Sequence, residues 1–86
     1  MKWHAEFTAN MGAGRTGEFS AEIEQEAEDA YRVKIYRHYT NDNQKYLQNN
    51  PRGFGDVKNS LEQAKKHVKK FVPNIDHRLV WVEKED

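Results

Sequence analysis

Cysteine is absent from the 86-residue sequence, which excludes several kinds of fold and site at once. Without cysteine the chain has no disulfide framework, no thiolate zinc site and no thiol nucleophile. The fold must therefore depend on packing alone, although a chain of this length buries only about 60–65% of its unfolded surface. We expect a single small domain, residues 1–86, with its core between two layers of secondary structure.

Long apolar runs and an excess of charge of one sign are also lacking. No stretch approaches the roughly 20 apolar residues of a transmembrane helix, and the amino-terminal MKWHAEF lacks the apolar centre of a signal peptide. Lysine plus arginine and aspartate plus glutamate number 14 each, so no overall field attracts nucleic acid or an anionic membrane. These features predict a cytoplasmic protein that does not bind membranes.

Proline occurs only twice, and Pro73 ends the one segment that is plainly helical. Ahead of it, apolar residues recur at the spacing that lines one side of an α-helix: Val57, Leu61, Ala64, Val68, Phe71 and Val72. Two residues can cap its start, namely Asp56 and Ser60, which has capping-box spacing to Gln63. We favour Asp56, because a helix that begins at Val57 keeps the whole apolar period.

Three segments alternate apolar and polar residues, as half-buried strands do: residues 2–10, 18–27 and 31–40. Residues 77–84 predict a further edge strand, beside either the first or the third. The fold class we expect is α+β, an antiparallel sheet of three to four strands in the order β-β-β-α-β with one helix packed on one face. The expected core consists of Trp3, Phe7, Phe19, Ile23, Val33, Ile35, Leu61, Ala64, Val68, Phe71 and Trp81.

Residues 41–56 are rich in asparagine, glycine and proline, which is typical of a loop. Within this loop, Gln44 to Gln48 are candidates for a brief pairing back onto the third strand. A connection of this length is uncommon in a small domain unless it is functional. The loop is therefore a second candidate contact region.

The polar faces of the second and third strands carry opposite charges. The second strand presents Glu22, Glu24 and Glu26, and the third presents Arg32, Lys34, Tyr36 and His38. If residues 28–30 form the connection, Glu24 lies opposite Lys34 and Glu26 opposite Arg32, and a slip by two residues still places opposite charges face to face. The pattern has two interpretations: it fixes the register, or it forms a docking surface with Tyr36 as an aromatic anchor.

Reactive motifs are scarce, and we expect no enzyme, cofactor or metal. Glycines 12, 14 and 17 spell G-x-G-x-x-G, but a strand follows them where a dinucleotide-binding motif needs a helix, so they predict a hairpin loop. The histidines lack H-x-x-x-H spacing, and Ser20 and Ser60 lie outside any G-x-S-x-G motif. Ser20 falls in the exposed row of the second strand, and the glutamates of that strand point into solvent instead of a cleft.

Nucleic-acid binding is the alternative function. The three strands followed by GFGDVKNSLEQAKKHV resemble AP2-like and integrase arm-binding domains, through Gly53, Phe54, Ser60, Glu62 and Ala64. The resemblance implies that the outer sheet face contacts DNA through Arg32, Lys34, Tyr36 and His38. The glutamates of the second strand would then face the phosphates, which opposes binding. A helix-side mode avoids that objection and would use Lys58, Lys65, Lys66, Lys69 and Lys70.

Our leading hypothesis is a small non-enzymatic module that binds another protein. The patterned outer face and the lack of reactive motifs favour it. Compact single-domain regulators and inhibitors of this kind are common in phage and mobile-element genomes, including inhibitors of host defence. Homodimerisation through residues 77–84 is a simpler version of the same idea, because an apolar edge strand invites pairing.

Overall fold

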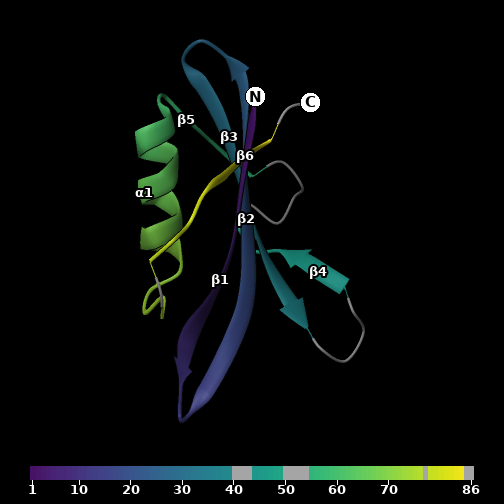
Figure 1. Cartoon of the computed structure of the whole chain (residues 1–86), viewed down its shortest axis with the longest axis vertical. Helices are drawn as coiled ribbons and strands as arrows, with labels where there is room; N and C mark the ends of the chain where they lie inside the picture. Colours follow the sequence, from purple (N-terminus) through teal and green to yellow (C-terminus); the bar gives the residue numbers. More distant parts are fainter. Residues whose placement is uncertain (40–43, 50–54, 77, 85–86) are drawn as a thin grey trace.

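The computed structural model describes residues 1–39, 44–49, 55–76 and 78–84. They form one antiparallel sheet with a helix on one side (Figure 1). In chain order the elements are β1 (Lys2–Gly12), β2 (Arg15–Ala27), β3 (Ala30–Tyr39), β4 (Gln44–Leu47), β5 (Asp56–Lys58), α1 (Leu61–Phe71) and β6 (Val82–Lys84). The strand order is β4-β3-β2-β1-β6, and β5 also pairs with β3. The α+β class is confirmed, but the sheet has six strands instead of three to four.

The two additional strands come from the expected loop and from the expected start of the helix. β4 pairs with β3, with Tyr36 opposite Leu47, as proposed for residues 44–48. β5 pairs with the other end of β3, with Tyr31 opposite Lys58. Two short segments thus share the outer edge of β3, and each is too short to show an alternating pattern of its own.

The glycine-rich segment forms the turn of the β1–β2 hairpin. Ala13 and Gly14 have φ of 52° and 75°, the left-handed pair of angles that a two-residue hairpin turn of type I′ requires. Gly17 lies within β2, where an added Cβ would come within 2.9 Å of the Phe19 ring. The segment is therefore a hairpin turn, as predicted from the strand that follows it.

The β2–β3 register differs by two residues from the expected one. Glu22 lies opposite Lys34, and Glu24 lies opposite Arg32. The cause is a two-residue turn at residues 28–29 together with an irregularity between Gln25 and Ala27. Opposite charges still face each other, because a register shift of two residues keeps the same side chains on the outer face, as the sequence predicted.

Helix α1 begins later than we favoured. Its cap is Ser60, whose Oγ accepts a hydrogen bond from the Gln63 amide at 3.2 Å. Asp56 is not the cap, because residues 56–58 are used in β5, and Val57 is consequently 48% exposed. At the other end Val72 has extended angles just ahead of Pro73.

The core lies between α1 and the sheet. It is formed by Ala5, Phe7, Ala9, Phe19, Ala21, Ile23, Val33, Ile35, Ala64, Val68, Val72 and Leu79, all buried. Trp3, Leu61 and Trp81 pack against this core but are only partly buried. Phe71, expected inside, is 41% exposed at the last turn of α1.

The carboxyl-terminal strand was expected beside either the first or the third strand, and the structure decides between them. Among the described residues 78–84, only Val82–Lys84 forms a strand, and it pairs with β1, not with β3. The expected strand of residues 77–84 is therefore too long, and His77 lies outside the described residues. Leu79 is buried, whereas Val80 and Val82 are 71% and 53% exposed. Within the described part of the chain, no helix has the length and apolarity needed to cross a bilayer.

The sheet is much longer than the helix that covers it. With 11 residues α1 is about 15 Å long, whereas the 13 residues of β2 span at most about 40 Å. Figure 1 shows the β1–β2 hairpin extending well beyond the end of α1. Part of the helix-side surface is therefore not covered by any helix of the described residues.

Candidate functional site

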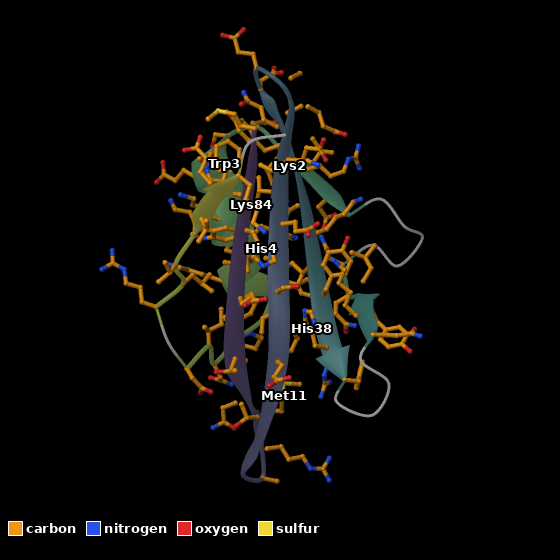
Figure 2. The ribbon with its side chains drawn as sticks, turned by 45° about the vertical axis from the view of Figure 1, so that its right-hand side comes forward. Lys2, Trp3, His4, Met11, His38 and Lys84 are labelled. Carbon is orange, nitrogen blue, oxygen red and sulfur yellow. The ribbon has the colours of Figure 1, made fainter. Side chains whose placement is uncertain are left out.

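The outer face of the sheet, on the side opposite α1, gathers most of the patterned charge. Strand pairing places Lys84, Lys2, Glu24 and Arg32 side by side in one row across the sheet, followed by a row of Val82, His4, Glu22 and Lys34. Figure 2 shows Lys2 and Lys84 toward one end of the sheet, His4 nearer its middle, and His38 and Met11 toward the other end. Carboxylates on the central strand thus lie between cations from both neighbours.

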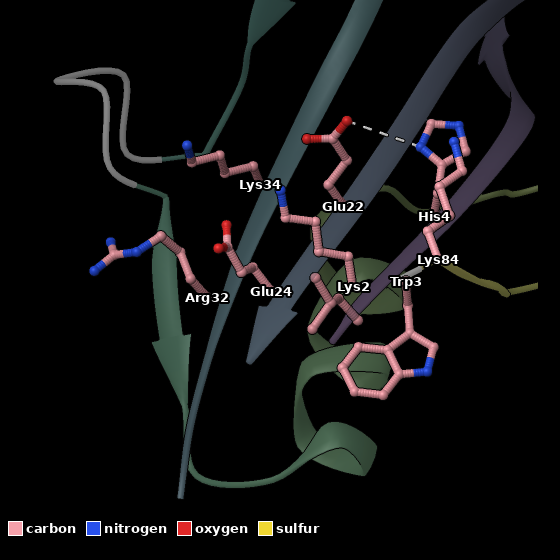
Figure 3. Close-up of a pocket in the computed structure, with 9 residues that line it drawn as sticks. Lys2, Trp3, His4, Glu22, Glu24, Arg32, Lys34 and Lys84 are labelled. Carbon is pink, nitrogen blue, oxygen red and sulfur yellow. Dashed lines mark ion pairs between the residues drawn. The ribbon is translucent and has the colours of Figure 1, made fainter. Parts of the chain in front are cut away.

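This arrangement forms a shallow hollow of about 110 Å³ at one end of the outer face. Figure 3 shows Glu22 and Glu24 between His4 on one side and Arg32 and Lys34 on the other. The side chains that line the hollow are Lys2, Trp3, His4, Glu22, Ile23, Glu24, Arg32, Lys34 and Lys84. Because charged groups of both signs line it, the hollow suits a polar or charged ligand group better than an apolar one.

The carboxylates here have partners within reach. Glu22 Oε1 lies 3.9 Å from His4 Nδ1 and 3.7 Å from Lys45 Nζ, which also lies 4.4 Å from the centre of the Tyr36 ring. Arg32 Nε donates to Glu26 Oε2 at 2.9 Å, and this hydrogen bond lowers the pKa of the Glu26 carboxyl. Partial burial raises the pKa of Tyr36. Exposed ion pairs contribute only about 0–1 kcal/mol each, so these charges are available to a partner at little cost.

Ser20 and His38 form a contact that the sequence did not reveal. His38 Nε2 lies 2.8 Å from Ser20 Oγ, and Ser20 is 1% exposed, so its expected place in an exposed row was wrong. The distance resembles that of a nucleophile and its base. Ser20, however, sits between Glu6 of β1 and Tyr36 of β3, where both ladders use the surrounding amides. The contact therefore satisfies a buried hydroxyl without offering donors for an oxyanion.

A polar network joins β3, β5 and α1 at the edge of the sheet. The side chain of Asn49, which is 1% exposed, accepts from the Ile35 amide at 2.7 Å and donates to the Val33 carbonyl at 2.9 Å. It also donates to Asp56 Oδ2, which lies 2.9 Å from His67 Nε2. The side-chain amide of Asn49 thus replaces the backbone of a paired strand in the gap between β4 and β5. Asp56 of β5, through His67, links the helix to the sheet.

This network predicts a loss of stability in acid. The hydrogen bond from Asn49, followed by that from His67, lowers the pKa of Asp56 from its usual 3.8. Because the carboxyl of Asp56 has a lower pKa in the folded protein than in the unfolded chain, its ionised form stabilises the fold. This stabilisation is complete above the unfolded-state pKa and is lost as the pH falls through the folded-state pKa. We expect the difference in unfolding free energy between the wild type and Asp56→Asn to be constant above about pH 5 and to shrink below it. Urea unfolding at pH 7, 4 and 2.5 measures it; a difference that grows in acid would contradict this role.

Most of the residues that the sequence nominated for partner binding do share one face. Cross-strand pairing puts Glu22, Glu24, Arg32, Lys34, Tyr36 and His38 on the outer face, and Glu26 reaches it through Arg32. The sequence missed the contributions of Lys2, His4, Lys45 and Lys84. Lys2 and His4 could have been found, because they occupy the polar positions of the first strand.

The lysines of the alternative site lie elsewhere. Lys66, Lys69 and Lys70 are exposed on α1, Lys65 is half-buried there, and Lys58 lies in β5. Lys66 Nζ lies 3.4 Å from Glu62 Oε1 one turn earlier. Because α1 packs on the opposite side of the sheet, these lysines cannot act together with the outer-face cations on a single short ligand.

Among residues 1–39, 44–49, 55–76 and 78–84, no group of three or more His, Asp or Glu side chains is arranged to hold a metal ion. Gly53 and Phe54, which carried part of the likeness to DNA-binding domains, lie outside the described residues. No family model, curated protein or solved structure matches this chain. The interpretation of the site therefore depends on its geometry.

Proposed function

We propose that this protein is a non-enzymatic module that binds another protein through the outer face of its sheet. The observation that carries the proposal is the pair of carboxylates Glu22 and Glu24 on β2, with Lys2 of β1 on one side and the cations of β3 on the other. They lie on a face over which the described residues place no helix. A protein partner can match both signs of charge at once. We extend the proposal to a regulator or inhibitor of the kind that phage and mobile elements encode, because the chain is expected to be a single small domain without reactive motifs.

The exposed apolar side chains at the borders of the outer face support the same proposal. Val82 pairs with His4 at one border and is 53% exposed, and Val57 pairs with Arg32 at the other and is 48% exposed. Protein interfaces combine apolar contact with polar pairs that set the register. Val80 and Val82 are also the exposed apolar side chains through which a homodimer, proposed above for residues 77–84, would form.

Nucleic acid fits this face less well. Phosphate neutralisation supplies most nucleic-acid affinity, yet Glu18, Glu22 and Glu24 run along the central strand of the face. The lysines of α1 remain the route by which the alternative function would act. Their contribution to DNA binding can be measured by neutralising them, as described below.

A swap of charges that conserves net charge tests the docking surface. Glu22→Lys combined with Lys34→Glu reverses one cross-strand pair but also places a lysine beside Lys45, so it should lower stability by up to about 1 kcal/mol. The partner is first isolated by affinity capture from the source cells, and its Kd is then measured by calorimetry. We expect the swap to weaken binding at least tenfold, because both charges of the pair then meet like charges on the partner.

The matched control is the same swap on the helix. Glu62→Lys with Lys66→Glu reverses an exposed pair on α1, also without changing net charge. It should leave partner binding unchanged. If the helix swap abolishes binding while the sheet swap does not, the outer face is not the docking surface.

Binding of labelled DNA tests the nucleic-acid alternative. Steeply salt-dependent binding that is lost when Lys65, Lys66, Lys69 and Lys70 are neutralised would support it.

A further inference from the structure

The helix side of the sheet has a second surface, where the sheet extends past the end of α1. A hollow of about 340 Å³ opens there between the last turn of α1 and the β1–β2 hairpin. We call it the Arg37 hollow; Met11, Phe19, Arg37, Phe71, Val72 and Pro73 line most of it. Figure 2 places Met11 toward the hairpin end of the sheet, far from Lys2 and Lys84.

Apolar side chains gather around this hollow. Met11 and Phe71 are 44% and 41% exposed and line it directly. Tyr39 and Tyr46 are 40% and 42% exposed, and their rings pack edge to face 5.4 Å apart beside it. Four of the eight large apolar side chains that are exposed in the described residues thus lie in one region. Such a gathering on a small domain is typical of a binding surface.

Arg37 brings a positive charge into this apolar setting. Its guanidinium carbon lies 4.9 Å from the centre of the Tyr39 ring and 5.8 Å from that of Phe19. Its Nε is buried and has no hydrogen-bond partner within the part of the chain that the structure describes. None of the residues that line the hollow is a carboxylate. The unsatisfied Nε–H carries a cost, and no carboxylate in the lining of the hollow offsets the charge of the guanidinium.

We propose that the Arg37 hollow binds a peptide segment of a partner in which an apolar side chain stands next to a carboxylate. The apolar side chain packs against Met11 and Phe71, and the carboxylate pairs with the guanidinium of Arg37. An arginine fork matches a carboxylate in two parallel hydrogen bonds, which explains why the charge is carried by arginine. This site lies on the opposite side of the sheet from the outer face and does not depend on the function proposed for that face.

N-acetyl-phenylalanine is a suitable probe, because it carries one ring and one carboxylate. It is titrated into isotope-labelled protein while the resonances of Arg37 Nε–H and the Met11 methyl group are followed. We expect saturable shifts of both. N-acetyl-phenylalaninamide has the same ring without the charge and should bind at least tenfold more weakly. Equal binding of the two probes, or shifts confined to other residues, would overturn the proposal.

Two variants separate the two halves of the site. Arg37→Gln should remove the preference for the carboxylate, and Phe71→Glu, at an exposed position that should not affect folding, should abolish binding of the acid by repulsion. Val80→Glu introduces the same charge at an exposed apolar position of the other sheet edge and should have no effect. Retention of full acid binding in either hollow variant would contradict the assignment. A concentration-dependent dimer that Arg37→Gln dissolves would contradict it too, because the occupant would then be a second copy of the chain.

Discussion

Gly55→Ala should destabilise the protein by about 3–5 kcal/mol, a large part of the total for a small domain. Gly55 is buried just before β5 with φ of 66°, and an added Cβ would lie 2.2 Å from the carbonyl oxygen of Val33. That oxygen belongs to the backbone of a central strand, so it cannot move aside as a side chain would. The left-handed angle adds a cost of its own for alanine. Urea unfolding followed by the fluorescence of Trp3 and Trp81 measures the effect.

The control for this prediction is a glycine with the same kind of angle and open space around it. Gly14 has φ of 75° and no heavy atom within 4 Å of its ideal Cβ position, the glycine and its chain neighbours aside. Gly14→Ala should therefore cost only about 1 kcal/mol, the conformational penalty alone. If the two variants lose similar stability, the close approach of Gly55 to Val33 does not exist in solution.

Asn49→Ala should have the second largest effect, about 3–4 kcal/mol. The substitution leaves the Ile35 amide and the Val33 carbonyl without the partners that lie at 2.7 and 2.9 Å, in the buried gap between β4 and β5. It also removes a hydrogen bond to Asp56. Chemical denaturation measures the loss, and amide exchange should show β3 losing protection at Ile35 before the rest of the strand.

Asn49→Asp distinguishes hydrogen bonding from volume. The aspartate has nearly the same shape but no amide donors, and it places a second carboxylate beside Asp56. At pH 7 it should be at least as unstable as Asn49→Ala. Asn59→Ala, at an exposed asparagine, should change stability by less than about 0.5 kcal/mol. An Asn49→Asp variant as stable as the wild type would show that the network is not formed as described.

The long alternating segments were readable from the sequence because one face of each is buried. The parity of Phe19, Ile23, Val33 and Ile35 correctly placed the sheet core, and the same parity placed Glu22 and Lys34 together on the outer face. The helix was readable from its apolar spacing, but its start was not, since Val57 fits both a helix and a short strand. Only the tertiary pairing of Tyr31 with Lys58 decides between them.

The features that stayed hidden depend on contacts between distant residues. Asn49 looked like an ordinary loop residue, because nothing local shows that its amide completes the edge of β3. Arg37 appeared only as a break in an apolar row. That its buried Nε has no hydrogen-bond partner among the described residues becomes visible only once the rings of Phe19 and Tyr39 are placed beside it. Register was uncertain by two residues, because a shift of that size preserves both the apolar face and the charge pairing.

The most direct test of the outer-face proposal is a map of the partner's footprint. Amide resonances of the labelled protein are recorded as the captured partner is added. The proposal predicts the largest changes at Glu22, Lys34 and Tyr36, with the amides of Lys66, Lys69 and Lys70 unchanged. A footprint confined to α1, with the amides of β2 and β3 undisturbed, would contradict it.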